Sequence, residues 1–192
     1  MIIILTGVPG TGKSTLARAL AKKLCCELIA ANEIVEKKKL WSDKDKFGTK
    51  IVKMRELGRE VGRIIRAARV RKHNLILEGH LLCEFPLKCD FVIITRAHPG
   101  ILEKRLKARG YPEEKINENV LAEALDYATQ LALRNYKKTK TKIYEVDAGK
   151  SGEKTLSEIM KIISGKNEKA RAGWANWSDQ LALLSERSIF PI

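Results

Sequence analysis

The chain has 192 residues, of which 44% are hydrophobic, so it is long enough to bury the core of one domain. It contains no run of 18 apolar residues, so we expect no membrane-spanning helix and no membrane partner. Its 37 lysines and arginines outnumber its 23 acidic residues, and the net charge of +14 favours partners that carry phosphate groups or acidic surfaces. The excess of positive charge is concentrated between Glu36 and Lys72. A solvated protein face without a charged partner would also explain it.

The first predicted element is a buried strand that leads into a glycine-rich loop. Residues 1–6 read MIIILT, a short β-branched run typical of a parallel strand. Residues 7–14 read GVPGTGKS and match the phosphate-binding pattern G-x-x-x-x-G-K-S/T without a mismatch. A helix with apolar residues at helical spacing follows from Thr15 to Leu24. The three elements therefore come in the order that a nucleoside triphosphate site needs.

Each residue type in this loop has a chemical reason. Glycines let the backbone turn its N–H groups inward toward phosphate oxygens. We predict that Lys13 reaches the β- and γ-phosphates of ATP, that the Ser14 hydroxyl ligates Mg²⁺, and that Thr15 touches the α-phosphate. The predicted ATP ligands in this loop are Gly10, Gly12, Lys13, Ser14 and Thr15.

The next segments are predicted to be a short strand at 27–30, a helix at 33–39 capped by Asn32, and a turn-rich connection at 41–48. A long helix is predicted over 49–72. Its outer face carries arginines four residues apart, at positions 55, 59 and 63. This arginine stripe fits a second phosphate-bearing substrate, an RNA backbone or a plain solvated face equally well.

A carboxylate and a histidine follow the next predicted strand, at 75–77. Ligands of parallel α/β sheets bind at the carboxyl ends of the strands, and Glu78 comes at such an end. We predict that Glu78 orients Mg²⁺ and its waters, and that His80, two residues later, faces the γ-phosphate. A lone histidine is also common as an ordinary hydrogen-bonded loop residue.

A strand is predicted at 90–95 and a helix at 99–107, with Gly110 ending the helix. Arg105 and Arg109 lie four residues apart on one helix face, so we predict that both close over the phosphates as a lid. The following helix is predicted to run from Glu113 to Lys137.

The last part of the predicted core consists of a strand at 142–146, a loop at 147–152 suited to wrapping a base, and a helix at 156–163 that stops at Gly165. Residues 166–192 form a basic extension with two tryptophans, in which Ser178 is predicted to cap a helix through Glu186. Packing on the core, dimerisation and partner binding all remain open for this extension.

The amino-terminal apolar run leads directly into the glycine loop without a basic lead, so we expect no signal peptide. The cysteines follow no zinc-binding spacing, and we expect small buried side chains in a reducing compartment. Both features predict a cytoplasmic protein, or a nuclear one in an organism with a nucleus. The four cysteines are Cys25, Cys26, Cys83 and Cys89.

Several of these motifs together resemble the atypical adenylate kinase family, the isoenzyme six type that includes the coilin-interacting nuclear ATPase of animals. The resemblance covers about residues 1–164 and is carried by the glycine loop, by Glu78-Gly79-His80, and by Arg109-Gly110-Tyr111 with Lys115 downstream. Asn119 and Glu123 continue the last of these patterns. The glycine loop is common to many proteins, whereas the Arg-Gly-Tyr segment is more specific.

The resemblance implies an α/β P-loop nucleoside monophosphate kinase fold, with a five-stranded parallel sheet of order 2-3-1-4-5 flanked by helices. It implies a kinase-like domain at 1–164, with an AMP-binding region at about 32–52 and a short lid at about 108–118, and a separate extension at 165–192. The implied catalytic residues are Glu78 and His80, beside our own predictions for Lys13 and Arg105, and Arg109 would bind ATP at the lid.

The resemblance also implies a broad adenylate kinase with ATPase activity that acts in small ribosomal subunit assembly and rRNA maturation. Its partners would be AMP as substrate and a platform ribosomal protein, with rRNA or the pre-ribosome as a further candidate. One departure is that the animal proteins have Asp-x-His where this chain has Glu78-x-His80, which leaves the balance of kinase and ATPase activity open. The rival functions are an ATP-driven assembly switch with little kinase role and, less favoured, a small-molecule kinase of the shikimate or gluconate type.

Overall fold

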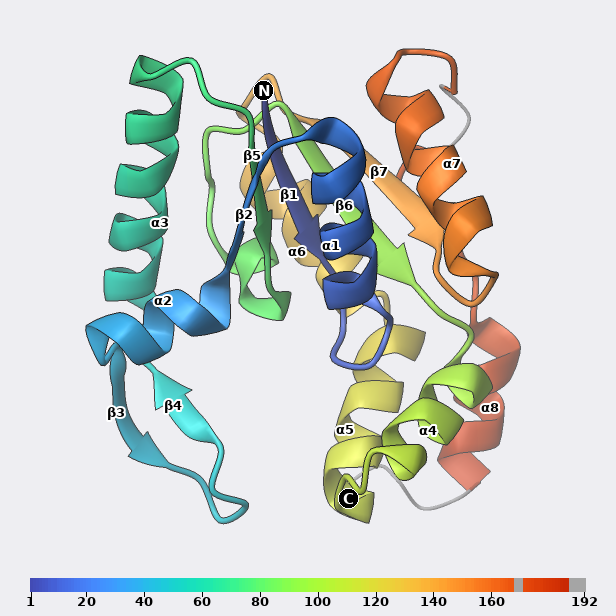
Figure 1. Cartoon of the computed structure of the whole chain (residues 1–192). Coiled ribbons are helices and arrows are strands. Elements are labelled where there is room, and N and C mark those ends of the chain that lie inside the picture. Colours follow the sequence, from blue (N-terminus) through green and yellow to red (C-terminus); the bar gives the residue numbers. More distant parts are fainter. Residues whose placement is uncertain (168–170, 187–192) are drawn as a thin grey trace.

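The centre of the molecule is a five-stranded parallel sheet (Figure 1). The computed structural model describes residues 1–167 and 171–186. The strand order is β2-β5-β1-β6-β7, which confirms the predicted order 2-3-1-4-5 when only the five sheet strands are numbered. The strands are β1 (Ile2–Thr6), β2 (Glu27–Ala30), β5 (Leu75–Glu78), β6 (Phe91–Arg96) and β7 (Lys142–Asp147).

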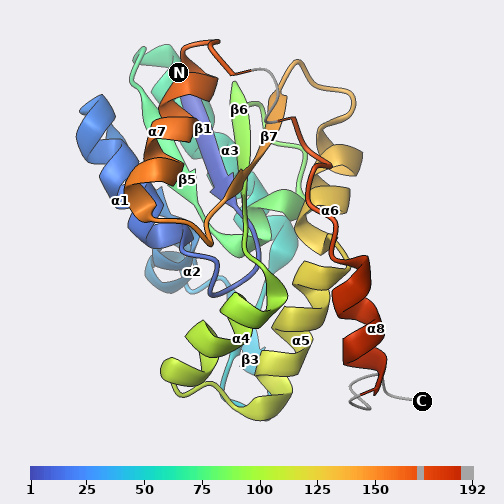
Figure 2. The same cartoon turned by 90° about the vertical axis from the view of Figure 1, so that its right-hand side faces the viewer.

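Helices cover both faces of this sheet because alternate side chains of β1 point to opposite sides (Figure 2). Ile3 and Leu5 belong to the core beneath two helices, α1 (Lys13–Leu24) and α7 (Gly152–Ile163). Ile2 and Ile4 belong to the core on the other face. That face is covered by α2 (Ala31–Lys38), α3 (Met54–Val70), the short 3-10 helix η1 (His80–Glu84) and α6 (Tyr127–Tyr136).

Two arms project beyond the carboxyl ends of the strands (Figure 1). One is a hairpin of β3 (Trp41–Lys44) and β4 (Lys50–Val52). The other consists of α4 (Pro99–Ala108) and α5 (Glu113–Ala124), against which α8 (Ser178–Glu186) packs through Leu184. Helix α8 ends at Glu186 as predicted, but Ser178, which was predicted to cap it, is its first residue. Residues 168–170 and 187–192 of the predicted extension lie outside the described part of the chain.

Several boundary predictions were wrong. Helix α7 begins at Gly152, four residues before its predicted start at Leu156. The segment at 41–48, predicted as a connection, contains the first strand and the turn of the hairpin. The helix predicted at 49–72 starts only at Met54, because residues 50–52 form β4 and Val52 pairs with Trp41. Helix α2 already begins at Ala31, so Asn32 lies inside it and does not cap it. The helix predicted from 113 to 137 breaks between α5 and α6, where Asp126 has a left-handed φ of 55°.

This break follows from a buried charge cluster centred on Arg96. The guanidinium donates to Glu123 Oε1 at 2.8 Å and also pairs with Asp126 and Glu145. The second oxygen of Glu145 accepts backbone N–H bonds from Gly173 and Trp174 at 2.8 and 3.0 Å. A buried cation needs such partners to offset its desolvation, so Arg96 ties β6, β7, α5 and the carboxyl-terminal segment together.

The cysteines are only partly as expected. Cys83 and Cys89 are buried, whereas Cys25 is exposed at the end of α1 and Cys26 is intermediate; all four thiols are free. No helix in the described ranges is long and apolar enough to cross a membrane.

Candidate functional site

The glycine loop after β1 has a backbone that side chains would obstruct. Gly7 has a φ of 135°, and a Cβ there would lie 2.5 Å from the carbonyl oxygen of Thr95. Gly10 has a φ of 92°, and a Cβ there would lie 2.7 Å from the side chain of Leu102 on α4. Glycine at these positions lets the loop turn sharply while it packs against β6 and α4.

Lys13 lies at the start of α1 and folds back over this loop. Its Nζ donates a hydrogen bond to the carbonyl oxygen of Val8 at 3.0 Å, and the side chain is largely buried. Burial lowers the pKa of Lys13 to about 8, against the opposing attraction of Glu78. A buried cation beside the glycine loop and the N-terminus of α1 makes this end of the helix strongly attractive to anions.

The sheet places Glu78 beside the first turn of α1. Parallel pairing sets Leu5 opposite Glu78, and Ser14 Oγ donates to Glu78 Oε1 at 3.0 Å. The other oxygen, Oε2, is buried without a hydrogen-bond partner among the described residues. An unpartnered buried carboxylate oxygen beside a hydroxyl is a donor set that fits Mg²⁺. Three-residue clusters of histidine, cysteine and carboxylate that could hold a metal are absent from the described part of the chain, so further ligands would have to come from phosphate and water.

His80 begins η1 and lines the same cleft as Lys13 and Glu78. Burial, and then the charge of Lys13, lower the pKa of His80 to about 4. The ring is therefore neutral at pH 7 and can offer one donor and one acceptor, but no positive charge.

The two predicted lid arginines have different positions. Arg109, at the end of α4, lines the cleft. Arg105 does not line it: its guanidinium donates to the carbonyl oxygens of Thr11 at 3.3 Å and Ala148 at 2.9 Å. Arg105 thus joins the glycine loop to the loop after β7, and its closing over phosphates stays a prediction.

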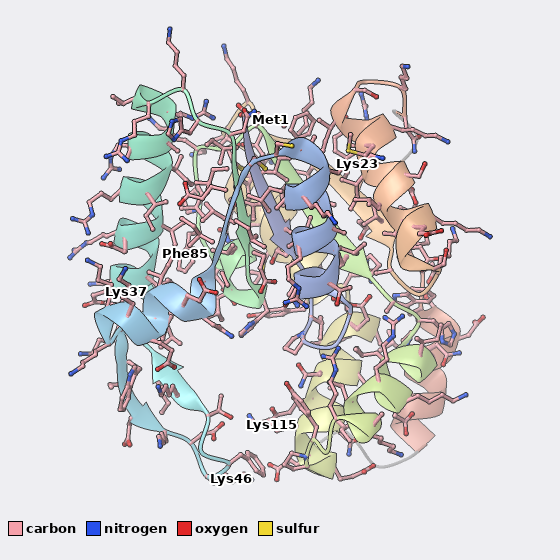
Figure 3. All side chains as sticks on the ribbon, viewed as in Figure 1. Met1, Lys23, Lys37, Lys46, Phe85 and Lys115 are labelled. Carbon is pink, nitrogen blue, oxygen red and sulfur yellow. The ribbon has the colours of Figure 1, made fainter. Side chains whose placement is uncertain are left out.

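A single cleft of about 920 Å³ collects most of the predicted residues. Gly10, Lys13, Ser14, Glu78, His80 and Arg109 all line it, while Gly12 and Thr15 lie beside it on the loop and the first turn of α1. The roles of these residues remain predictions. The cleft lies between the two arms, as the sticks of Figure 3 show.

Sequence reasoning missed part of the cleft wall on the side away from the glycine loop. Tyr127, at the start of α6, donates its hydroxyl to Glu84 Oε1 of η1 at 2.6 Å, and both residues line the cleft. Phe47 and Lys50 reach the cleft from the hairpin, within the region at about 32–52 that the resemblance implied for AMP. Glu84 and Tyr127 come from separate elements with no shared motif, so only the tertiary structure brings them together.

Comparisons with known proteins show what this chain is similar to. A family model described as an AAA domain matches residues 3–126. A protein of Pyrococcus furiosus named "Putative adenylate kinase" is 38% identical over 183 residues, covering 93% of this chain and 92% of that protein. A protein of the same name from Methanosarcina acetivorans is 35% identical over 192 residues, covering 94% of this chain and 100% of that protein.

Solved structures show the same fold. A shikimate kinase from Aquifex aeolicus aligns with a TM-score of 0.52 at 18% identity, over 86% of this chain and 97% of its own. A deoxyadenosine kinase from M. mycoides aligns with a TM-score of 0.54 at 19% identity, over 87% of this chain and 100% of its own. At such identities the likeness concerns the fold alone.

The neutral state of His80 can be tested by NMR. We expect its ring signals to stay unchanged between pH 8 and about pH 5, because the folded-state pKa is about 4. The unfolded chain takes up this proton near pH 6.5, so His80 lowers the free energy of unfolding as the pH falls from about 6.5 toward 4. His80→Gln identifies the signals and removes this contribution. A His80 titration centred near pH 6.5 would contradict the buried, neutral ring.

Proposed function

Because the chain belongs to the family of the relatives named putative adenylate kinase, we propose that it transfers the γ-phosphoryl group of ATP to AMP. Slow hydrolysis of ATP would be a side reaction. The proposal rests on one cleft that has the glycine loop at one end and residues of the hairpin, η1 and α6 at the other. Its volume of about 920 Å³ lies at the upper end of the range for one small ligand, which suits two nucleotides side by side.

The proposed roles divide the cleft between the two substrates. Residues 32–52 would bind AMP, since Asn32, Phe47 and Lys50 line the cleft from this stretch. Residues 108–118 would act as the lid over ATP, to which Arg109 belongs. The kinase-like domain would comprise residues 1–164, and 165–192 would form an extension whose helix α8 packs against α5 through Leu184.

Catalysis would rest on positioning and charge, because phosphoryl transfer asks for little covalent chemistry from the protein. Lys13 would neutralise charge that develops on the β- and γ-phosphates, with the backbone N–H groups of the glycine loop beside it. Ser14 and Glu78 would hold Mg²⁺, which supplies further neutralisation of phosphate charge when bound. His80, neutral at pH 7, would donate or accept a hydrogen bond near the γ-phosphate without adding charge.

We further propose that the protein assists assembly of the small ribosomal subunit and rRNA maturation, through a platform ribosomal protein. This proposal is supported by the outer face of α3. Arg55, Arg59 and Arg66 are exposed there, and no carboxylate among the described residues pairs with them. Nitrogen-tipped side chains along α3 point away from the sheet in Figure 3. Together with the net charge of +14, such a face suits a phosphate backbone.

The kinase proposal is tested by measuring ADP formation with ATP and each nucleoside monophosphate in turn. We expect turnover that depends on AMP, and we expect Lys13→Ala to lower it by about a hundredfold because it removes charge where the transition state needs it. Lys23→Ala, an exposed change at the far end of the same helix, should leave turnover unchanged (Figure 3). No AMP-dependent turnover under any condition would remove this proposal.

The assembly proposal is tested by a pull-down in which this protein is immobilised and the amount of platform ribosomal protein that it retains is measured. The pull-down is done in ATP and in ADP, with and without rRNA, and at two salt concentrations. An ATP-driven switch predicts different retention in the two nucleotides. Replacing Arg55, Arg59 and Arg66 by glutamine should weaken retention in the presence of rRNA and reduce its salt dependence, because fewer phosphates are neutralised. Equal recovery in ATP and ADP would count against the switch.

A further inference from the structure

The tip of the hairpin touches the first turn of α5 across the mouth of the cleft. Lys115 Nζ of α5 lies 3.1 Å from Asp45 Oδ2 of the hairpin, and Lys46 pairs with Glu114 beside it. The ring of Phe47 lies 5.1 Å from the ammonium of Lys115 and 5.0 Å from that of Lys46. Figure 3 shows Lys46 and Lys115 arriving from the two arms at the same place. The cleft is therefore enclosed where the arms meet.

The turn of the hairpin aims the carboxylate of Asp45 at the lid. Its Oδ1 accepts backbone N–H bonds from Phe47 at 2.9 Å and Thr49 at 2.8 Å, and its own N–H donates to the Thr49 carbonyl at 2.8 Å. These bonds fix the side chain and leave Oδ2 for Lys115. Asp45 thus has two separable tasks, which are shaping the turn and pairing with the lid.

Both side chains of the ion pair are partly covered by the protein. Lys115 and Asp45 have side chains only 23% and 28% exposed. The pKa of Lys115 is raised by its hydrogen bonds to Glu118 and Asp45. The pKa of Asp45 is lowered because hydrogen bonds from Thr49, Lys115 and Phe47 outweigh the opposing desolvation. Both directions favour the charged forms that attract each other.

The contact between the arms is made by side chains. No backbone hydrogen bond joins the hairpin to α5 in the described ranges, so the arms can part without breaking secondary structure. Closing such a cleft excludes water and completes the arrangement of reacting groups, and parting it admits substrate.

We infer that Asp45 and Lys115 are positioning residues for phosphoryl transfer: their ion pair, here called the clasp, holds the hairpin against the lid and closes the AMP side of the cleft. The inference rests on the proposed kinase function. With the clasp closed, the γ-phosphoryl group meets AMP in preference to water. The clasp therefore sets the ratio of transfer to hydrolysis and the KM for AMP, while the site for ATP at the glycine loop is left as it is.

The test uses Asp45→Asn, which keeps an oxygen for the Phe47 and Thr49 N–H groups but removes the charge that meets Lys115. We expect the ratio of AMP-dependent ADP formation to phosphate release to fall about twofold to fivefold, the range for a partly exposed ion pair. The KM for AMP should rise and the KM for ATP should stay unchanged. Lys107→Met is the matched control, because the ion pairs that Lys107 makes with Glu103 and Glu113 lie within the arm of α4 and α5.

A double-mutant cycle with Lys115→Met separates the clasp from any independent contact of Lys115 with substrate. Coupling between the two changes supports the clasp, whereas fully additive effects, or no effect of Asp45→Asn, would overturn it.

Hydrogen exchange of the Phe47 and Thr49 amides gives a readout that does not depend on catalysis. Lys115→Met leaves the turn intact and should speed this exchange, and an unchanged rate would also overturn the clasp. If the wild-type protein forms no ADP from AMP, the proposed function fails on its own, while the exchange rates still decide whether the clasp exists.

Discussion

The parallel pairing of β1 with its two neighbours is the constraint on which the site depends. Because Leu5 lies opposite Glu78, the glycine loop and the end of β5 are brought to the same edge of the sheet. The hydrogen bond from Ser14 to Glu78 then follows from the register, since α1 starts where the loop ends. A slip of one residue in β5 would turn the side chain of Glu78 to the opposite face of the sheet, away from Ser14.

Two buried cations link this edge to the lid. Lys13 closes the glycine loop, while Arg96 holds Glu123 near the end of α5 and Asp126 just after it. The loop also packs directly on the lid, because Val8 shares a cluster with Leu102, Leu106 and the carboxyl-terminal helix. The arm of α4 and α5 is therefore anchored to the sheet at one end, while at its other end Lys115 meets the hairpin.

The sequence was sufficient for the elements whose signals are local. The sheet strands and the glycine loop could be predicted because β-branched runs and the spacing of glycines and Lys13 reflect the backbone directly. The hairpin could not be predicted, because Ile51 and Val52 continue an apolar pattern that a helix also satisfies, and the pairing of Trp41 with Val52 decides between the two. The break at Asp126 was hidden for a similar reason, since its cause is the distant Arg96. The cleft wall at Glu84 and Tyr127 and the clasp both join segments far apart in the chain.

We propose that the cleft holds two nucleotides at once, with their phosphates meeting beside Lys13. The most direct measurement uses a bisubstrate analogue in which two adenosines are joined by five phosphates. Its binding is measured by calorimetry, first with the analogue alone and then in competition with ATP or AMP. The account predicts one molecule bound per chain, displaced by both ATP and AMP, and bound at least about a hundredfold more tightly than either, since the second half binds without a further loss of translational freedom. An analogue that binds no more tightly than ATP and is not displaced by AMP would contradict it.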